Sequence, residues 1–379
     1  MPALTTWMLA AATMLAPTFG IEIPIRIDVD CEADRALERA LAEAESLRKV
    51  DNYLHGVCEG NYVIAGDGVT LRAATGESGL AAPEGDSGYL PVLEVVDAEA
   101  SLRGLVVRGG VVGVLVRGWD AEVLLYEVDV HDQDGVGVIA SRGARVRVLN
   151  STVRDASLGI LAETDSWLNL QNVIVDNQDD GIIVTDRSFA ALNDTTIENS
   201  RTGGLGVTRR SDVNILGGIF RENGQVHVHA GEWSSVTLLY EVTIGSETDT
   251  TPYALGAIRY ATIASYTTPA IYGDVSALVG GSIRLGETVL DGDLSVSQFA
   301  NAHVRNSEIT GIVFCRDGAE AICRRTTTAG AVDCPSPTCG PEPAEAVDRA
   351  ISTPELPVLE VPDYERRPGS RPLRRESSR

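Results

Sequence analysis

Residues 159–184 read GILAETDSWLNLQNVIVDNQDDGIIV, which is one complete repeat followed by the start of the next. Gly159 and Gly181 each open a run in which apolar residues alternate with others, and two more apolar runs lie between them. Three short strands and three turns fit into such a unit of 22 residues. A repeat of this length indicates a solenoid, a propeller or an array.

The repeat extends in both directions. LLYEVDV, residues 124–130, and LLYEVTI, residues 238–244, lie 114 residues apart, which corresponds to five units of 22–24 residues. The residues that match one another at this spacing are Val107, Val130, Val153, Val175, Ile197, Phe220 and Ile244. A unit of this length fits one coil of a parallel β-helix. The sequence therefore predicts an all-β, single-stranded solenoid of about ten coils.

Each coil has expected inward and corner positions. The opening strands are expected at Gly113, Gly137, Gly159, Gly181, Gly204 and Gln225. The inward residues of the second strands are expected to be Val123, Val146, Leu168, Ala190, Val213 and Val236. A corner column then contains Glu127, Asn150, Asn172, Asp194, Gly217 and Glu241. Short polar residues and glycine tolerate a left-handed backbone, so we expect a sharp turn in this column.

The quoted stretch, with glycine before an apolar strand and asparagine at the corner, resembles the right-handed parallel β-helix family of the pectate-lyase-like superfamily. VCEGNYVIAGDGVTLRA, residues 57–73, is similar to the first coils of that family. The resemblance covers residues 50–315 and implies a right-handed parallel β-helix. It implies little about activity, because the superfamily includes lyases, hydrolases, epimerases, tailspikes, adhesins and inert scaffolds.

Both ends of such a stack need a cap, because their strand edges are otherwise unpaired. In residues 33–48, a helix would place Ala36, Leu37, Ala40, Leu41, Ala44 and Leu47 on one apolar stripe over the first coil. The six cysteines lie near the two ends of the chain. We expect Cys31 to bond to Cys58, and the other four to pair among themselves in an order that the sequence leaves open: Cys315, Cys323, Cys334 and Cys339. A zinc site built from the last four is the alternative.

These observations divide the chain into five expected parts. They are a signal peptide at 1–20, an N-terminal cap at 21–58, the β-helix at 59–314, a cysteine-rich cap at 315–340 and a disordered tail at 341–379. No stretch reaches 18 apolar residues, so no membrane span is expected. The sequence therefore predicts a secreted or cell-surface protein.

The net charge of the 379 residues is −23, and Lys49 is the only lysine. This charge argues against nucleic acid and anionic membranes as partners. Residues 366–379 are basic, with six arginines and one glutamate, and could serve either to keep the tail solvated or to tether it to a surface. We expect a monomer whose partner is a polysaccharide.

YEVDVHDQD, residues 126–134, resembles in spacing the Y-G-F-D-P-H motif of the mannuronan C5-epimerases. The resemblance makes Tyr126, Asp129 and His131 the catalytic candidates. Val130 stands at the proline position, and the motif falls on a third strand rather than on an opening strand.

Two pairs of residues are candidates for ligand binding. In QVHVHAG, residues 225–231, His227 and His229 are expected to share the outward face, either exposed to solvent or shared by one metal ion or ligand. Trp167 and Phe189 are expected to stack at one corner, either as a sugar platform or as a shield for the corner. Trp119 and Trp233 lie in the same turn of other coils.

The third turns are acidic, and a stack of carboxylates is a candidate calcium site. The candidate ligands are Asp132, Asp134, Asp155, Asp179 and Asp180. The alternative is a hydrated acidic edge that Arg154 and Arg201 partly neutralise.

An apolar stripe is expected on the outside of the opening strands, formed by Leu115, Ile139, Leu161 and Ile183. Such stripes mark a partner or an intramolecular cover. ELPVLEVPDY, residues 355–364, has the composition to be that cover.

Two functions remain open. The regular coils and the absence of a clustered acid–base pair favour a non-catalytic recognition or structural module, directed toward carbohydrate. The alternative is a polysaccharide-active lyase, epimerase or glycoside hydrolase, so whether the protein is an enzyme is left open. No cofactor is expected to be required, although calcium is a candidate.

Overall fold

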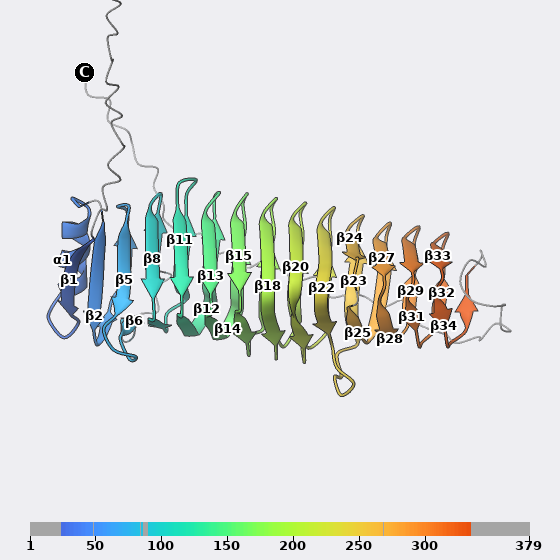
Figure 1. Ribbon diagram of the computed structural model, residues 1–379. Coiled ribbons are helices and arrows are strands. Elements are labelled where there is room, and N and C mark those ends of the chain that lie inside the picture. Colours follow the sequence, from blue (N-terminus) through green and yellow to red (C-terminus); the bar gives the residue numbers. More distant parts are fainter. Residues whose placement is uncertain (1–23, 48, 84, 86–89, 268, 335–379) are drawn as a thin grey trace, which may run out of the picture.

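The computed structural model describes residues 24–47, 49–83, 85, 90–267 and 269–334. In this part of the chain, short strands are wound into coils that stack along one axis, and strands of neighbouring coils pair in parallel (Figure 1). Each coil contains up to three strands, so the strands form three long series.

The first strands of the coils are β4 (Tyr62–Ile64), β7 (Pro91–Val96), β10 (Val112–Arg117), β17 (Asp180–Val184), β19 (Gly203–Val207), β21 (Val226–Ala230), β23 (Tyr253–Ile258), β26 (Asp274–Leu278), β29 (Leu294–Val296), β32 (Val313–Cys315) and β35 (Val332–Asp333). Two longer strands, β12 (Asp129–Ser141) and β14 (Thr152–Ala162), begin as third strands and continue into the first strand of the next coil.

The second strands are β1 (Ile25–Asp30), β2 (Val50–His55), β5 (Val69–Ala73), β8 (Glu99–Arg103), β11 (Glu122–Tyr126), β13 (Arg145–Leu149), β15 (Trp167–Gln171), β24 (Thr262–Ser265), β27 (Ser282–Gly286), β30 (Asn301–Arg305) and β33 (Glu320–Arg324). In the middle coils the second and third strands form one bent strand, as in β18 (Phe189–Glu198), β20 (Asp212–Arg221) and β22 (Ser235–Ile244). The remaining third strands are β3 (Val57–Glu59), β6 (Gly79–Ala81), β9 (Val106–Arg108), β16 (Ile174–Asp176), β25 (Ala270–Tyr272), β28 (Val289–Asp291), β31 (Glu308–Ile309) and β34 (Thr327–Thr328).

One column of paired residues on the third strands passes through about thirteen coils. It contains Cys58, Leu80, Val107, Val130, Val153, Val175, Ile197, Phe220, Ile244, Ile271, Leu290, Ile309 and Thr328. The seven members predicted from the repeat are confirmed. The expected number of about ten coils is too low, because the repeat shortens to 19 residues beyond Ile271 and escapes a search at 22–24.

The glycines on the first strands are required by close packing. At Gly159, an added Cβ would lie 2.6 Å from the carbonyl oxygen of Gly181 and 2.7 Å from Cγ1 of Val175. Similar contacts, at 2.4–2.6 Å from a carbonyl oxygen of the next coil, apply at Gly113 and Gly181. These positions have no room for a side chain because the backbone of the next coil is too near.

The corner between the second and third strands has the expected left-handed backbone. Glu127, Asn150, Asn172, Asp194 and Gly217 all have positive φ, between 48° and 78°. The Nδ2 of Asn172 donates a hydrogen bond to Oδ1 of Asn150 (3.0 Å), which forms one rung of a ladder along the axis.

The last member of the corner column differs from the sequence prediction. Tyr240 (φ 62°), not Glu241, adopts the left-handed conformation. The pairing register between β20 and β22 shifts between Leu216 and Gly218, so this coil contains one extra residue at its corner.

The N-terminal end of the stack is covered by the helix α1 (Ala36–Ala44), which packs on β1 and β4 (Figure 1). The predicted stripe is confirmed: Leu37, Ala40, Leu41 and Ala44 are buried, and Ala36 and Leu47 pack against the core. No helix among the described residues is long and apolar enough to cross a membrane.

Disulfides close both ends. Cys31 bonds to Cys58, as predicted, and Cys315 bonds to Cys334 across the paired strands β32 and β35. Cys323 is also disulfide-bonded, and Cys339 lies outside the described residues. The zinc alternative is therefore wrong for Cys315 and Cys334.

The apolar stripe on the outside of the first strands is present but buried. Ile139, Leu161 and Ile183 are each 3% exposed or less. They form a second apolar cluster with Val112, Val136 and Leu158, against which Leu115 packs. Residues 355–364, the expected cover, and residues 1–20 and 341–379 lie outside the described residues.

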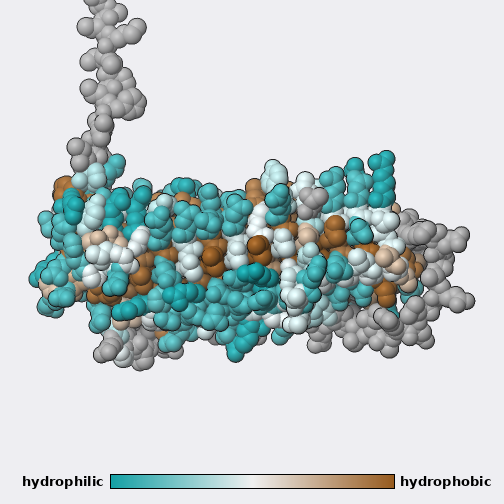
Figure 2. All heavy atoms as spheres, turned by 60° about the horizontal axis from the view of Figure 1, so that its bottom comes forward, coloured by the Kyte–Doolittle hydropathy of each residue, from teal (hydrophilic) through white to brown (hydrophobic). Residues whose placement is uncertain are grey.

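Another face of the molecule shows hydrophobic residues in a lengthwise band between hydrophilic margins (Figure 2). Several large apolar side chains on the third strands are exposed, among them Ile174, Ile219 and Val289, at 39–51%. The outside of the stack is therefore not uniformly polar.

The glycine packing gives a first test. Gly159→Ala should lower the free energy of unfolding by about 1–3 kcal/mol, because the new methyl group overlaps a backbone carbonyl that cannot move without shifting a coil. Gly76→Ala is the matched control, since nothing lies within 4 Å of its added Cβ, and it should change stability by at most about 0.5 kcal/mol. Urea unfolding of both variants measures the difference, and equal effects would contradict the packing argument.

Candidate functional site

The first turn, between the first and second strands, repeats the same backbone in successive coils. Two consecutive residues are left-handed, as at Asp186 and Arg187 (φ 53° and 64°) and at Glu232 and Trp233 (φ 53° and 69°). The N–H of the second residue donates to the carbonyl of the first residue in the next coil, as from Arg187 to Arg209 (3.1 Å). The turns therefore stack in register, and their side chains form two rows along the axis.

A ladder of buried serines supports these turns from the inside. The backbone N–H groups of Ser166, Ser188 and Ser211 donate to the hydroxyl oxygens of Ser188, Ser211 and Ser234 at 3.1–3.2 Å. Each serine thus connects one turn to the next, which fixes the spacing of the outer side chains.

The first of the two rows, the ion-pair row, consists of Asp186, Arg209, Glu232 and Arg259. Acid and base alternate along it, and Arg209 lies 3.3 Å from Asp186 and 3.9 Å from Glu232. Arg259 closes the row at 3.0 Å from Glu232. The charges of this row therefore largely neutralise one another.

The second row, the binding row, consists of Arg187, Arg210, Trp233 and Tyr260. Arg187 makes two hydrogen bonds to Asp165, at 2.6 and 2.7 Å, and this contact lowers the pKa of the Asp165 carboxyl. No ion pair or hydrogen bond of the Arg210 side chain occurs among the described residues. The row thus presents two arginines followed by two aromatic rings.

The two aromatic rings stack on each other and remain accessible. The ring centroids of Trp233 and Tyr260 are 4.6 Å apart at an interplanar angle of 19°, and the residues are 64% and 56% exposed. Behind them, Tyr260 leans over Gly280, where an added Cβ would lie 2.7 Å from the tyrosine ring. These contacts fix the two rings in place before any ligand binds.

Both rows line one groove on the surface, with a volume of about 760 Å³. Its walls contain Thr164, Asp186, Arg187, Arg209, Arg210, Glu232, Trp233, Arg259 and Tyr260. Aromatic faces and paired arginine side chains in an open groove are suited to binding a sugar, because ring faces pack on pyranose C–H groups and guanidinium groups donate to its oxygens.

The aromatic pair that stacks in the groove differs from the pair that the sequence suggested, and sugar binding by Trp167 and Phe189 stays a prediction. Trp167 and Phe189 pair in register on β15 and β18, two positions after the turn, and both are only partly exposed and outside the groove. The sequence does contain a pattern that marks such rings. An aromatic residue stands second of the two residues in a first turn, and the same position one coil later holds glycine or another aromatic residue. Trp119 over Gly143 and Phe299 over Gly318 show the same arrangement as Tyr260 over Gly280.

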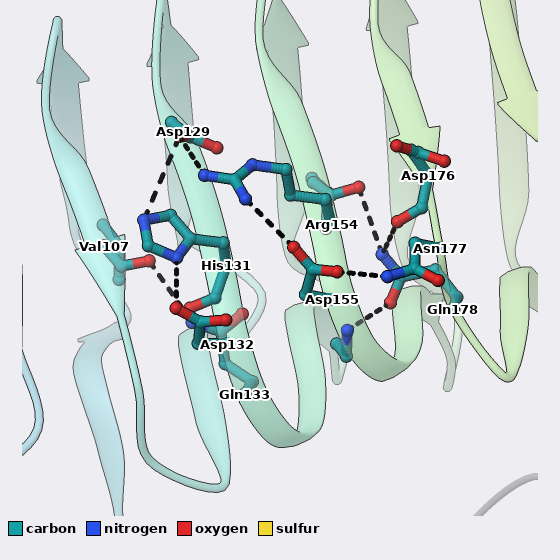
Figure 3. Close-up of polar contacts among 12 residues, drawn as sticks. Val107, Asp129, His131, Asp132, Gln133, Arg154, Asp155, Asp176, Asn177 and Gln178 are labelled. Atoms are coloured by element: carbon teal, nitrogen blue, oxygen red, sulfur yellow. Dashed lines mark hydrogen bonds and ion pairs between the residues drawn. The ribbon is translucent and has the colours of Figure 1, made fainter.

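Asp129 and His131 of the epimerase-like motif lie on the outside of β12 (Figure 3). Nδ1 of His131 is 2.7 Å from Asp132, and its Nε2 is 4.0 Å from Asp129. Arg154 bridges Asp129 and Asp155 at 3.0 and 2.9 Å. Asp129 and His131 are therefore joined in one ionic network.

Tyr126 belongs to the preceding second strand and instead faces Arg103, whose guanidinium carbon is 5.9 Å from the ring centroid. His131 also lines a cavity of about 520 Å³, together with Glu77 and Arg108. The structure thus brings together two of the three catalytic candidates and adds Glu77 and Arg108 to them.

The acidic third turns contain direct partners for several candidate calcium ligands. Asp132 contacts His131, Asp155 contacts Arg154 and Asn177, and Asp179 is 2.9 Å from Arg201. Burial, with a contribution from Asp179, raises the pKa of Asp180 to about 6. Among the described residues, no group of three or more His, Cys, Asp or Glu side chains is arranged to hold a metal ion. Calcium binding by these residues and Asp134 stays a prediction.

The histidine pair is not exposed, contrary to one sequence expectation: His227 and His229 are 0% and 2% exposed. The pairing of β19 with β21 matches Gly204, not Gly206, to His227, so the opening position predicted at Gln225 is wrong by two residues. His227 therefore occupies a place in the glycine column and turns toward the third turn, whereas His229 lies on the outer column that contains Ile183 and Gly206.

His227 is part of a buried polar network that closes the loop after β22, which protrudes from the stack (Figure 1). The Nδ2 of Asn223 is 3.1 Å from Nδ1 of His227, and Nε2 of His227 is 3.1 Å from Asp249. Thr251 binds the same carboxylate through its hydroxyl (2.6 Å) and its N–H (2.9 Å). The third turn of this coil is longer than in its neighbours, which leaves room for the His227 side chain at a position where the preceding coils have glycine.

Burial dominates the protonation of these groups. It lowers the pKa of His227 to about 4, although Asp249 opposes the shift, and it lowers the pKa of His229 to about 4 with a smaller contribution from Arg259. Both ring nitrogens of His229 are buried without a hydrogen-bond partner. Burial alone would raise the pKa of Asp249, but hydrogen bonds from Thr251 and from the Glu222 N–H lower it overall.

The two histidines predict a pH dependence of stability. Their folded pKa values lie below the unfolded value of about 6.5, so the unfolded chain binds more protons and stability falls as the pH drops from about 6.5 to about 4. Asp180 acts in the opposite direction, because its folded pKa is raised.

His229→Leu isolates one contribution. The free energy of unfolding of this variant should fall by on the order of 1–3 kcal/mol less than that of the parent protein between pH 6.5 and 4. The substitution should not destabilise the protein at pH 7, because His229 makes no hydrogen bond that would be lost. The exposed His303→Leu is the control and should leave the pH dependence unchanged. Denaturant unfolding at a series of pH values measures both, and an unchanged slope for His229→Leu would contradict the assignment.

Comparison with known proteins agrees with the coiled architecture. Residues 158–250 match a family described as "Right handed beta helix region". No curated protein matches the chain. Among solved structures, the A-modules of the Azotobacter vinelandii mannuronan C-5 epimerases AlgE6 and AlgE4 are 14% and 13% identical, with TM-scores of 0.49 and 0.41. They cover 82% and 79% of this chain and 95% of their own length.

The gp42 tailspike of Acinetobacter phage vb_AbaP_AS12 is 10% identical, with a TM-score of 0.31, over 80% of this chain and 62% of its own. Such values are too low to transfer a site or an activity. The family match covers residues 158–250 only, and parallel coils continue on both sides of it, so the described residues have the fold of a right-handed parallel β-helix.

Proposed function

We propose that this protein is a non-catalytic recognition module that acts outside the cell and binds polysaccharide in the first-turn groove. The observation that carries the proposal is the exposed, stacked pair Trp233 and Tyr260 beside arginines in a groove of about 760 Å³. Stacked turns repeat at about 4.8 Å along the axis, which suits a polymer lying lengthwise in the groove.

The groove supports binding better than catalysis. Glycoside hydrolysis requires a carboxylic acid and a second carboxylate placed across the bond, and lyases and epimerases require a free base. The two carboxylates that line the groove, Asp186 and Glu232, are both held in ion pairs with arginine. Both belong to the ion-pair row, so arginine side chains already contact them and they lie in one row along the axis.

Action outside the cell is supported by the disulfides at the two ends of the coiled region. Such bonds form and persist in oxidising compartments. The acidic surface, with a net charge of −23, gives no support to nucleic acid or anionic membrane as a partner.

Substitution of Trp233 tests the proposal. Trp233→Ala should weaken binding to oligosaccharides found in a glycan screen by about tenfold or more, because a central aromatic residue contributes more than 1 kcal/mol. Trp119→Ala is the matched control, since Trp119 is similarly exposed in an equivalent turn outside the groove. Equal binding by both variants and the parent protein would exclude this groove as the site.

An enzymatic function remains the second candidate, and the observation that favours it is the cavity of about 520 Å³ that contains His131, Glu77 and Arg108. If this cavity is catalytic, purified protein should depolymerise or epimerise alginate or pectate. His131→Ala should then reduce turnover by about 100-fold, as expected for loss of a general acid or base. No turnover by the parent protein, measured by product absorbance and by NMR, would contradict the enzymatic function.

A further inference from the structure

The groove carries a charge opposite to that of the rest of the molecule. Four arginines line it, at positions 187, 209, 210 and 259, against the two acids Asp186 and Glu232, which gives the lining residues a net charge of +2, or +1 when Asp165, the partner of Arg187, is included. The whole chain has a net charge of −23. A local positive site on an acidic protein attracts anions that the rest of the surface repels.

The four arginines are not equivalent. Arg209 and Arg259 belong to the ion-pair row, and Arg187 is held by Asp165. Arg210 is exposed and its side chain makes no ion pair or hydrogen bond among the described residues. It lies one coil from Arg187 in the same row, about 4.8 Å away in backbone spacing. Because Asp165 already pairs with Arg187, Arg210 is the charge that an oxyanion bound between the two arginines would neutralise.

The position of Arg210 relative to Trp233 defines the space for a ligand. Trp233 stacks on Tyr260 of the next coil, so its second ring face is directed toward the coil that carries Arg210. Arg210 does not occupy that face, because the cation–π contacts of the described residues involve Tyr53, Tyr126 and Phe314 instead. At this end the groove is therefore lined by the Arg210 guanidinium group and by the exposed indole of Trp233.

We infer that this end of the groove binds an acidic sugar unit, with its carboxylate or sulfate held by Arg210 and Arg187 and its ring against the exposed indole of Trp233. Guanidinium groups bind both oxyanions through paired N–H donors, so the two sources share one chemistry. The inference rests on the proposed function of the groove and adds the charge of the ligand and its orientation. The acidic group lies toward the N-terminal end of the stack, because Arg187 and Arg210 precede Trp233 along the row.

Four tetrasaccharide probes test this inference by titration calorimetry on the full chain. They are tetragalacturonate, its methyl ester, which keeps the rings but removes the charge, a κ-carrageenan tetrasaccharide, which carries sulfate but no carboxylate, and the neutral cellotetraose. At least one acidic probe should bind about tenfold more tightly than the neutral probes, and that preference should decline between 50 and 200 mM salt. The comparison of uronate with sulfate identifies which oxyanion is preferred.

Arg210→Gln should abolish the preference for the acidic probe while leaving the weaker binding of neutral probes. Arg147→Gln makes the same change in net charge at an exposed arginine outside the groove and should leave the preference intact. If the acid and its methyl ester bind equally and Trp233→Ala still abolishes binding, the groove binds sugar and the inference is wrong. If neither acidic probe binds, the inference is also wrong, and if the neutral probes and the wider glycan screen fail as well, the proposed function falls with it.

Discussion

Parallel hydrogen bonding between coils, residue against residue, is the constraint on which every other feature of this structure depends. Because each residue pairs with one residue of the next coil, a position must be filled compatibly in all coils at once. Inward positions become continuous apolar columns, such as the one through Val130 and Val153. Where the backbone of the next coil is too near, as at Gly159, only glycine fits.

The same constraint explains where irregularity is allowed. An extra residue on a strand would reverse the inward and outward faces of that strand, so it must be placed at a turn. The corner at Tyr240 holds one extra residue in a left-handed conformation, and the loop after β22 holds several more, closed by Asp249 and His227. Binding surfaces can form at the turns for the same reason. Side chains that project from stacked turns do not have to match those of the next coil, but they are still spaced by the distance between coils. The row from Arg187 to Tyr260 is an example.

Much of the fold was predictable from the sequence, because pairing between coils makes similar residue types recur at the length of one coil. The column from Val107 to Ile244, the corner from Glu127 to Gly217 and the apolar face of α1 all follow from spacing and residue type. The histidines at 227 and 229 were misplaced because the letters QVHV match the preceding coils at the wrong register, and only the pairing of Val226 with Gly203 shows the shift. Coils of 19 residues near the C-terminus were missed for a similar reason.

The site was harder to predict than the fold. The sequence shows that Trp167 and Trp233 both lie near a first turn. It does not show that Trp167, two positions later, lies on a partly covered strand, whereas Trp233 lies in an open groove. Nor does it show that Arg187 has an acidic partner while Arg210 has none in the part of the chain that the structure describes, since that depends on which acid the adjacent coil presents. These properties depend on contacts between coils, which no single repeat contains.

The disulfides affect how the molecule can come apart. A stack in which each coil contacts only its neighbours ordinarily loses its terminal coils first, since a terminal coil has one neighbour rather than two. Here Cys31–Cys58 ties the segment before α1 to the first coils, and Cys315–Cys334 ties together the last two coils. Fraying from the ends is therefore suppressed at both termini of the stack. Unfolding of the stack must begin in its cysteine-free middle, where separating two coils breaks three strand pairings at once. An exopeptidase that depends on fraying at the ends of the stack would therefore digest the coils slowly.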